Sequence, residues 1–255
     1  MNLLAIETSS EYLSLALEAG GTLHDYHEHA GQLHAERILG EIMTLIAGAG
    51  LQKADLQGIA FGCGPGSFTG LRIACGVTQG LAYALDVRVK GIVTLMALAE
   101  DLFRTDGCRQ VIACSDARMG EVYHAAYRLE TVNGLDQWLE VSTPMVCKPE
   151  QVPDIAGYQP GEWAGCGTGF GVYGEALGQR HAGLRLVRAE RVPTARAALA
   201  LAKPFFTSGQ ADLPEQAQPI YIRDNVALKK GEQKTTFNPL PTLPTLPTVT
   251  TVTAA

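Results

Sequence analysis

The feature that most constrains the fold is a glycine-rich turn at residues 62–76, GCGPGSFTGLRIACG. This stretch holds five glycines and a proline, which allow a tight backbone corner. The apolar run before it, Gln57–Phe61, predicts a short buried strand, and the weakly charged run Thr69–Leu85 predicts a helix. A strand, a glycine turn and a helix in this order indicate the α/β class, in which helices pack on a sheet.

The turn does not match the named phosphate-binding loops. A Walker A loop requires a lysine after its last glycine, and none stands there. The dinucleotide fingerprint Gly-x-Gly-x-x-Gly also fails, because Ser67 or Thr69 occupies the third glycine position. Two interpretations stay open: the helix start binds an anion through its free N–H groups, or Ser67 or Thr69 only caps the helix. The residues predicted to approach a nucleotide or phosphate are Glu7, Thr8, Ser9, Gly64, Gly66, Ser67 and Thr69.

The first hundred residues alternate strands and helices. Short apolar or alternating runs, separated by serine and glycine pairs, predict a three-stranded meander. Apolar spacings of three and four predict the helices. The order strand-strand-strand-helix-strand-helix-strand-helix requires a mixed sheet with helices on its faces. The other predicted elements here are strands Leu3–Glu7, Tyr12–Glu18, Thr22–His27 and Val87–Ile92, and helices Leu33–Ala49 and Leu95–Phe103.

A second, smaller lobe is predicted to begin at residue 106 and to repeat the strands, glycine turn and helix of the first. The boundaries are therefore placed at 1–105 and 106–230. After Lys230, the repeat NPLPTLPTLPTVTTVTAA has no core-forming period, so residues 231–255 are predicted to be a disordered tail that favours polyproline II. Predicted elements of the second lobe are strands Val111–Ser115, Glu121–Leu129, 137–142, Trp163–Gly165 and Leu184–Val187, and helices Pro149–Ile155, 172–179 and Thr194–Thr207.

Two helices carry faces that one core does not readily explain. Small residues recur every fourth position in helix 69–85, although an interior glycine costs about 1 kcal/mol relative to alanine. Apolar positions in helix 33–49 cover roughly 160° of the helical wheel, against about 100° for an ordinary surface helix. The protein's own sheet and second lobe, or a partner subunit, could cover these faces. We predict a partner, and expect Ile42→Asp to abolish association while the fold stays intact. The predicted interface residues are His34, Arg37, Ile38, Glu41, Ile42, Leu45, Gly70, Ala74, Thr78, Leu81 and Ala82.

Composition and charge restrict the partners and the location. The 255 residues are 46% apolar and carry a formal net charge of −6, which argues against tight binding of nucleic acid by this chain alone. The six cysteines have no Cys-x-x-Cys spacing and are expected to be reduced and buried. The amino terminus lacks the basic region of a signal peptide, and the run 73–85 is too short to span a membrane. We expect a soluble cytoplasmic protein without membrane contact.

No complete catalytic or metal-binding set is present in the sequence. Four histidines cluster between residues 24 and 34, which is more typical of a solvated strand edge; the zinc spacing His-x-x-x-His from His34 reaches Ile38 instead of a ligand. No Gly-x-Ser-x-Gly motif or Cys–His pair indicates a nucleophile. Glu7 could act as a base or hold a metal-bound phosphate, or only bond to turn amides. We therefore assign no catalytic residue and no metal site.

Five motifs, in order, resemble the bacterial TsaB (YeaZ) family. They are LLAIETSS at the start, HAERIL at 34–39, GPGSFTGLRI at 64–73, DARMGEVY at 116–123 and PIYIRDNVA at 219–227. The resemblance covers about residues 1–230. It implies the two-lobed fold of the actin-like ATPase, sugar kinase and Hsp70 (ASKHA) class, with each lobe a mixed sheet and helices. The element order predicts such a sheet independently.

The resemblance also implies a role in making the tRNA nucleoside threonylcarbamoyladenosine. TsaB-like proteins are non-catalytic scaffold partners of TsaD, which transfers the threonylcarbamoyl group from threonylcarbamoyl-AMP to N6 of the adenosine next to the anticodon, together with the ATPase TsaE. A heterodimer with TsaD, a homodimer when alone, and tRNA contact only through the complex are implied.

The chain departs from the catalytic relative in ways that bear on cofactors. TsaD-like proteins carry a His-x-x-x-His metal motif that Ile38 breaks here. The second lobe is short for a complete adenosine pocket, although Gly165, Gly167 and Gly169 could form half of one. No cofactor is expected within this chain alone, and ATP or ADP is expected only at an interface with TsaD and TsaE.

Two other functions stay open from the residues themselves. The glycine turns and Glu7 suggest a stand-alone nucleotide hydrolase or a glycoprotease-like peptidase. A direct tRNA-binding module is the third, and the acidic charge balance argues against it.

Overall fold

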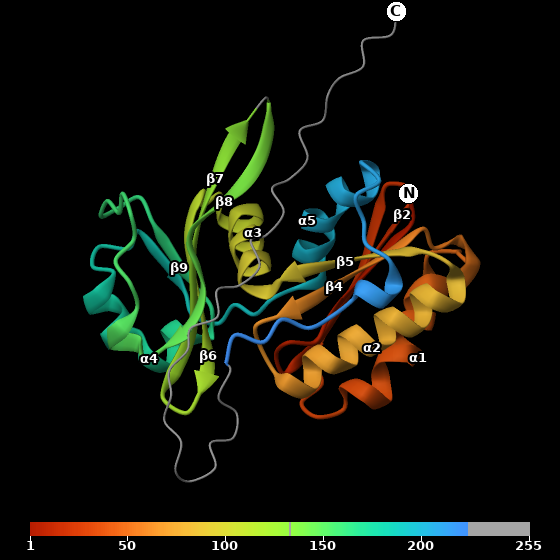
Figure 1. The fold of residues 1–255 in the computed structure, drawn as a ribbon, viewed down its shortest axis with the longest axis horizontal. Helices are drawn as coiled ribbons and strands as arrows, with labels where there is room; N and C mark the ends of the chain where they lie inside the picture. The colour runs from red at the N-terminus through yellow and green to blue at the C-terminus, as the bar shows by residue number, and fades with distance from the viewer. Residues whose placement is uncertain (133, 224–255) are drawn as a thin grey trace, which may run out of the picture.

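The computed structural model describes residues 1–132 and 134–223. Within them, two five-stranded sheets form two lobes that lie side by side (Figure 1). The strand orders are β3-β2-β1-β4-β5 and β10-β9-β6-β7-β8. The strands are β1 Leu3–Glu7, β2 Tyr12–Ala19, β3 Thr22–His29, β4 Gly58–Gly64, β5 Arg88–Val93, β6 Gln110–Arg118, β7 Glu121–Val132, β8 Leu135–Cys147, β9 Ala164–Cys166 and β10 Leu186–Arg188. The helices are α1 His34–Gly48, α2 Phe68–Leu85, α3 Thr94–Asp106, α4 Thr168–Arg180 and α5 Ala195–Thr207, with short 3-10 turns η1 Lys53–Asp55, η2 Pro149–Gln151 and η3 Pro214–Gln216.

Strand β1 lies at the centre of the first sheet and is buried on both faces. It pairs antiparallel with β2 and parallel with β4. Because side chains alternate along a strand, Leu4 and Ile6 pack into the core beneath α1 and α2, while Leu3 and Ala5 pack into a second core beneath α5. Helices therefore cover both faces of this sheet, as the apolar runs predict.

The strands and helices predicted for the first lobe are confirmed, with ends shifted by a few residues. In the second lobe, the predicted helix Pro149–Ile155 is wrong, because only the single turn η2 forms. Pro153 disfavours a helical conformation at Val152, which adopts φ −58° and ψ 138°. Strand β8 is longer than the predicted 137–142, and α4 begins before the predicted 172–179, directly after Gly167.

The end of the described chain returns to the first lobe. Helix α5 lies within the range 106–230, yet it packs on β1, β2, β4 and β5. Farther along, Asp212 forms a bridge with Val89, and Ile220 N donates a hydrogen bond to the Cys63 carbonyl at 2.7 Å. The boundary at residue 106 thus marks where the second sheet begins but does not divide the lobes in space. The apolar pattern of the alanine-rich helix α5 does not indicate which of the two sheets it packs on. A boundary at one residue number also cannot describe a chain that returns to the first lobe.

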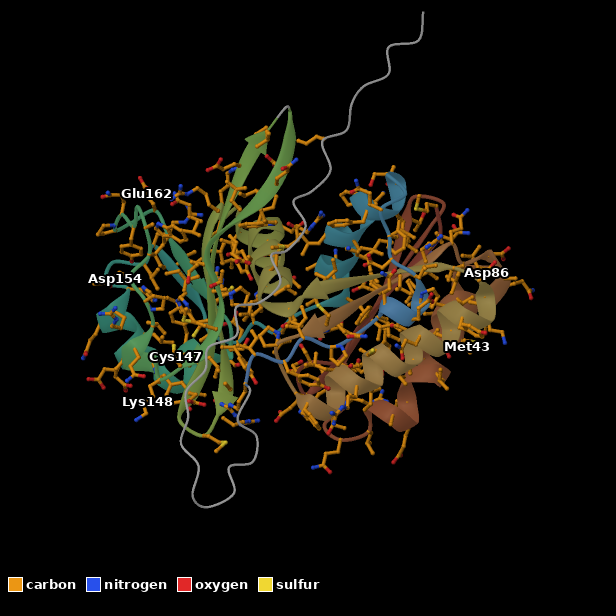
Figure 2. The ribbon with its side chains drawn as sticks, in the orientation of Figure 1. Met43, Asp86, Cys147, Lys148, Asp154 and Glu162 are labelled. Carbon is orange, nitrogen blue, oxygen red and sulfur yellow. The ribbon has the colours of Figure 1, made fainter. Side chains whose placement is uncertain are left out.

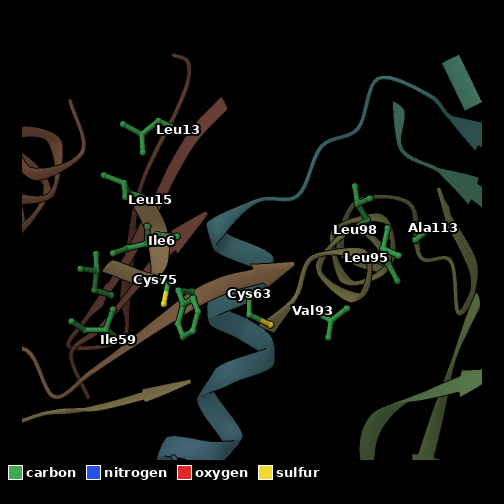
Figure 3. Packing of buried hydrophobic residues seen from close by; sticks show 14 of the residues in the cluster. Ile6, Leu13, Leu15, Ile59, Cys63, Cys75, Val93, Leu95, Leu98 and Ala113 are labelled. Carbon is green, nitrogen blue, oxygen red and sulfur yellow. The ribbon is translucent and has the colours of Figure 1, made fainter. Parts of the chain in front are cut away.

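Helix α3 joins the two lobes through one shared core. Leu95 and Leu98 are fully buried and belong to the same apolar cluster as Ile6 of the first sheet and Ala113 of the second. Figure 3 shows this packing, which continues from the first sheet through α3 to Ala113. The shared core therefore connects the two lobes through α3.

The remaining expectations concern cysteines, membrane spans and the tail. All six cysteines are free and five are buried, which confirms their expected role as small apolar residues. Among the described residues, no helix combines the length and the apolar character that a membrane crossing requires. The predicted tail, residues 231–255, and the last residues of the motif PIYIRDNVA lie outside the described residues.

Candidate partner surface and interlobe cleft

The glycine turn is a corner packed tightly against the residues that follow β1. A Cβ at Gly70 would overlap the Thr8 carbonyl oxygen, and one at Gly66 would come within 2.6 Å of the Ser9 Cβ. Thr8 Oγ1 donates to the Gly70 carbonyl at 2.7 Å, and Ser67 N donates to the Ser9 carbonyl at 2.8 Å. The close approach of two backbone segments therefore requires these glycines.

Ser67 caps helix α2. Its Oγ accepts a hydrogen bond from Gly70 N at 3.3 Å, and its carbonyl accepts one from Leu71 N at 2.8 Å. This confirms the capping interpretation for Ser67, whereas Thr69 is exposed at the helix start. One of the N–H groups that an anion would need is thereby already satisfied within the chain.

Glu7 is sealed inside the first lobe. Its Oε1 accepts a hydrogen bond from Ser9 N at 2.6 Å, while Oε2, packed against Gly62, has no hydrogen-bond partner among the described residues. Burial raises the pKa of this carboxyl, and the hydrogen bonds from Ser9 offset only part of that rise. The prediction that Glu7, Thr8 and Gly64 approach a ligand is corrected: all three are buried and none lines the cleft, because β1 and the turn close over them.

A cleft of about 1270 Å³ separates the lobes. Four of the residues predicted to approach a phosphate line it: Ser9, Gly66, Ser67 and Thr69. The opposite wall includes the end of β6, where Asp116–Arg118 come from the motif DARMGEVY. The sequence motifs at 64–73 and 116–123 therefore meet across one cleft.

Each of the three arginines in the cleft wall is held by carboxylates. The pairs are Arg118 with Glu11 and with Asp116, both at 3.2 Å, Arg191 with Asp101 at 3.0 Å, and Arg223 with Glu121 at 2.5 Å. Proteins bind phosphate mainly through arginine, lysine and helix N-termini. A phosphate in this cleft would have to draw an arginine away from its carboxylate.

An aromatic platform, which we define as Phe68 and Tyr221, forms part of one wall. The ring centroids lie 5.5 Å apart, and both side chains are more than a third exposed. The guanidinium carbon of Arg72 lies 3.5 Å from the Phe68 centroid and 5.5 Å from that of Tyr221. Arg72 does not itself line the cleft, so its cation–π contacts hold the rings in place and leave them open to the cleft.

The glycines of the second lobe do not form half of a pocket. A Cβ at Gly165 would clash with the Phe170 ring, and a Cβ at Gly167 or Gly169 would clash with the Cys114 carbonyl. These glycines allow the start of α4 to pack closely on β6. The expectation of an adenosine half-site here is therefore corrected.

The histidines are placed as a strand edge and a core contact. His34 Nε2 donates to the Tyr12 carbonyl at 3.1 Å, and Ile38 is buried in the core. His27 and His29 are exposed on the edge strand β3, where the His27 ring stacks on the Tyr12 ring and the His29 ring lies nearly perpendicular to it. Within residues 1–132 and 134–223, no group of three His, Cys, Asp or Glu side chains is positioned to hold a metal ion.

The residues predicted to face a partner are turned mostly inward. Seven of them are buried by this chain: His34, Ile38, Ile42, Gly70, Ala74, Thr78 and Ala82. The other four, Arg37, Glu41, Leu45 and Leu81, are partly buried. The apolar stripe of α1 is wide because this helix packs at once on β2, β3 and α2. The prediction is corrected for these seven residues, since the chain's own core already covers them.

A different face of the same two helices stays open. Arg37 and Glu41 contact Tyr26 of β3 on one side of α1, so Leu39 and Met43 on the other side lie toward α2. On α2, Cys75 and Gln79 donate to the Ala217 carbonyl, so the opposite side lies toward α1. We name the open face the helix-pair surface: Leu39, Met43, Ile73, Gly76, Val77 and Gly80.

The helix-pair surface is apolar and uncharged. Leu39 is 51% exposed, and a Cβ at Gly76 or Gly80 would meet no atom within 4 Å. Helices α1 and α2 lie side by side along the outside of the first lobe (Figure 1). Figure 2 places Met43 at the opposite end of the molecule from Lys148 and Asp154 of the second lobe.

Known proteins match almost the whole described chain. It is 39% identical over 231 residues to the tRNA threonylcarbamoyladenosine biosynthesis protein TsaB of Escherichia coli (strain K12), a match that covers 90% of this chain and 98% of that protein. The chain belongs to the TsaB family. The Haemophilus influenzae TsaB protein is 35% identical over 234 residues, 90% of this chain and 97% of its own length. The solved structure of YeaZ from Pseudomonas aeruginosa matches with a TM-score of 0.78 at 38% identity, covering 86% of this chain and 99% of that one.

The family model described as TsaD, tRNA N6-adenosine threonylcarbamoyltransferase, matches residues 21–163. Together with the two mixed sheets and the YeaZ match, this confirms the two-lobed actin-like fold. In this TsaB family member, the motif at 64–73 makes the turn and start of α2, and the motif at 116–123 spans the end of β6, the β6–β7 turn and the start of β7.

Sequence reasoning missed both the helix-pair surface and the aromatic platform. Phe68 and Tyr221 stand in two of the family motifs, and the presence of an aromatic residue in each motif is the sequence signal for the aromatic platform. Nothing local predicts that the segment 218–223 returns to the start of α2. Gly76, Gly80 and Ala84 form a second four-residue repeat of small residues in α2, but the spacing alone does not distinguish this exposed repeat from the buried one beside it.

Proposed function

We propose that this TsaB family member is a non-catalytic subunit in the synthesis of tRNA threonylcarbamoyladenosine. It binds a TsaD protein and supports transfer of the threonylcarbamoyl group from threonylcarbamoyl-AMP to N6 of the adenosine next to the anticodon. The shared description of its relatives as tRNA threonylcarbamoyladenosine biosynthesis proteins supports this pathway. The match to the TsaD family model indicates that this chain and the transferase TsaD are related, which supports TsaD as the partner.

The internal bonding of the cleft supports a non-catalytic role. The polar groups that a phosphate-transfer site would use are engaged: Thr8 with Gly70, Ser67 with its own helix, and the cleft arginines with carboxylates. Glu7 is buried away from the cleft. We therefore propose that ATP or ADP binds at an interface with TsaD and TsaE, and that tRNA contact occurs within the assembled complex.

The observation that carries the partner role is the exposed glycine pair of α2, Gly76 and Gly80. An interior helix glycine costs about 1 kcal/mol relative to alanine, and no neighbouring atom of this chain requires glycine at Gly76 or Gly80. A partner helix that approaches α2 closely would require it, because a side chain there would hold the two backbones apart. We infer that TsaD packs on the helix-pair surface, and that a second copy of this chain covers it when TsaD is absent.

Size-exclusion chromatography of the purified chain mixed with TsaD tests this role. The wild type is expected to co-elute with TsaD, and Leu39→Asp is expected to elute separately because it places a charge in an apolar contact. The matched control is Val187→Asp, a similarly exposed apolar residue on β10 of the second lobe, which should co-elute like the wild type. Separate elution of the wild-type proteins would end the proposal.

A stand-alone nucleotide hydrolase or peptidase is not favoured, since the relatives are described as biosynthesis proteins. Turnover of ATP or of a peptide by this chain alone would restore that alternative. The activity would have to follow the chain through purification and disappear in a folded cleft variant such as Tyr221→Ala.

A further inference from the structure

We propose that the chain's own Pro/Thr segment, residues 240–248, docks in the interlobe cleft against the aromatic platform. This is independent of the partner role, because Ile73 is the one residue of the helix-pair surface that also lines the cleft. Three features support the docking: the place where the described chain ends, the charge of the cleft, and the match between the repeat and the aromatic wall.

The described chain ends in the wall of the cleft. Ile220 N is bonded to the Cys63 carbonyl of the first lobe, and three residues later Arg223 is bonded to Glu121 of the second. Both Tyr221 and Arg223 line the cleft. The segment begins 17 residues after Arg223 (240 − 223), and an extended chain of that length reaches up to about 55 Å at roughly 3.3 Å per residue. The connection is therefore long enough to fold back into the cleft.

The charge of the cleft suits a neutral ligand. The three arginines in its wall are each paired with a carboxylate, so a neutral ligand enters without separating an ion pair, whereas a nucleotide must compete with those carboxylates for its phosphates. Residues 235–255 contain no charged side chain. The segment therefore has the charge that this cleft accepts at least cost.

The repeat has the period of a polyproline II helix. That helix has three residues per turn, and residues 240–248 read LPTLPTLPT, a repeat of three. In this conformation Leu240, Leu243 and Leu246 form one ridge, the three prolines a second, and the three threonines a third. Two adjacent ridges are apolar and one is polar, so the segment has an apolar side along about 28 Å at roughly 3.1 Å per residue.

The wall offers the side chains that such ligands bind. Polyproline II segments dock on grooves lined by aromatic rings, because the helix is already ordered and its proline rings pack flat on them. Phe68, Tyr221 and Tyr12 line the cleft from the first lobe, and Tyr123 lines it from the second. Tyrosine hydroxyl groups can also donate to the free backbone carbonyls of the segment. The segment would thus contact both lobes at once.

Photocrosslinking of the full chain tests this docking. Leu243 is replaced by p-benzoylphenylalanine, and cross-linked peptides are mapped by mass spectrometry. We expect cross-links within one chain to peptides that contain Phe68, Tyr123 or Tyr221, with a yield independent of protein concentration. Tyr221→Ala should lower the yield roughly fivefold by removing one aromatic contact, and replacing Pro241, Pro244 and Pro247 with glycine should lower it similarly. Tyr83→Ala, an exposed tyrosine on α2 outside the cleft, is the matched control and should leave the yield unchanged.

Three results would overturn the docking. Cross-links between two chains that increase with concentration would show that the tail of another copy is the occupant. Cross-links spread over the surface, with a yield unaffected by Tyr221→Ala or by the proline changes, would show that the segment has no site. ATP binding by the full chain that Tyr221→Ala abolishes would assign the cleft to a nucleotide instead. If Tyr221→Ala lowers the unfolding temperature, Phe68→Ala tests the same wall. No arm of the experiment contains TsaD, so its failure leaves the partner role untouched.

Discussion

The helix-pair surface and the interlobe cleft are built in opposite ways, although both include the glycine turn and its helix. The helix-pair surface has no charged residue, and two of its six residues are exposed glycines. The cleft is lined by arginines, each already matched by a carboxylate, and by aromatic rings. An apolar surface with glycines suits a folded partner at short distance, whereas a cleft whose arginines are already paired with carboxylates favours an anion less. The difference supports the proposal that a partner binds the outside of the first lobe.

The largest expected effect is the difference in stability between two variants with substitutions on neighbouring turns of α1, Ile42→Asp and Leu39→Asp. Ile42 is fully buried and Leu39 is half exposed. Ile42→Asp should lower the free energy of unfolding by about 4 kcal/mol, because it buries an unpaired charge, while Leu39→Asp should change it by less than about 0.5 kcal/mol. Urea unfolding followed by circular dichroism measures both. From sequence, Ile42→Asp is expected to abolish association while the fold stays intact. Because Ile42 is fully buried, the structure instead predicts that this variant destabilises the fold.

A folded and stable Ile42→Asp protein that no longer binds TsaD would contradict this comparison. It would return the interface to the buried face of α1, and would require the helix to turn or separate from the sheet when the partner binds.

The second prediction sets the stability of the free chain against association. Replacing Gly76 and Gly80 with alanine should stabilise the free protein by about 1–2 kcal/mol in total, because both glycines are interior to a helix and a Cβ has room at each. The same change should weaken TsaD binding, since the added methyl groups separate the helices. Thermal unfolding and a titration with TsaD measure the two effects. Gly178→Ala on α4, where a Cβ also has room, should stabilise the chain and leave binding unchanged. If the variant with alanine at 76 and 80 and the Gly178→Ala variant bound TsaD with equal affinity, Gly76 and Gly80 would not be part of the interface.

The sequence predicts the elements well and the surfaces poorly, for a physical reason. Apolar period is local, so it reveals α1 and α2 and most strands directly. It does not reveal how many neighbours a stripe contacts: Ile38 and Ile42 face the sheet, while Leu39 between them faces outward. Contacts that depend on the return of the chain, such as Phe68 with Tyr221 or α5 with β1, have no local pattern at all. The family motifs identify the residues of the cleft, but only the fold shows that their charges are already matched.

The third prediction concerns Glu7, beneath the glycine turn. Burial raises the pKa of this carboxyl above its ordinary value of 4.5, so the folded protein binds the proton more tightly than the unfolded chain does. The free energy of unfolding therefore falls as pH rises from 4.5 to the folded pKa, and the loss is complete above it. Glu7→Gln keeps an acceptor for Ser9 N and removes the buried charge.

Glu7→Gln should therefore be more stable than the wild type at about pH 8, by roughly 1–2 kcal/mol, and nearly equal to it at about pH 4. Urea unfolding at a series of pH values measures the difference. A constant difference across that series would show that Glu7 does not titrate in this window. A loss of stability at high pH in the variant would show that the carboxylate is needed in its charged form.

The smallest expected effect tests whether the two regions are independent. Arg118 ends β6 in the wall of the cleft, is largely exposed, and pairs across the lobes with the exposed Glu11 and within its own strand with Asp116. Exposed ion pairs contribute about 0–1 kcal/mol, so Arg118→Gln should change the free energy of unfolding by less than about 0.5 kcal/mol and TsaD affinity by less than about twofold. Arg118 has a left-handed φ of 61°, and glutamine tolerates that conformation no better than arginine, so the change isolates the charge. Isothermal titration calorimetry with TsaD measures the affinity of the Arg118→Gln variant and of the Leu39→Asp variant for comparison. If Arg118→Gln weakens TsaD binding as much as Leu39→Asp does, the partner also contacts the interlobe cleft. The helix-pair surface and the cleft would then not be separate in function.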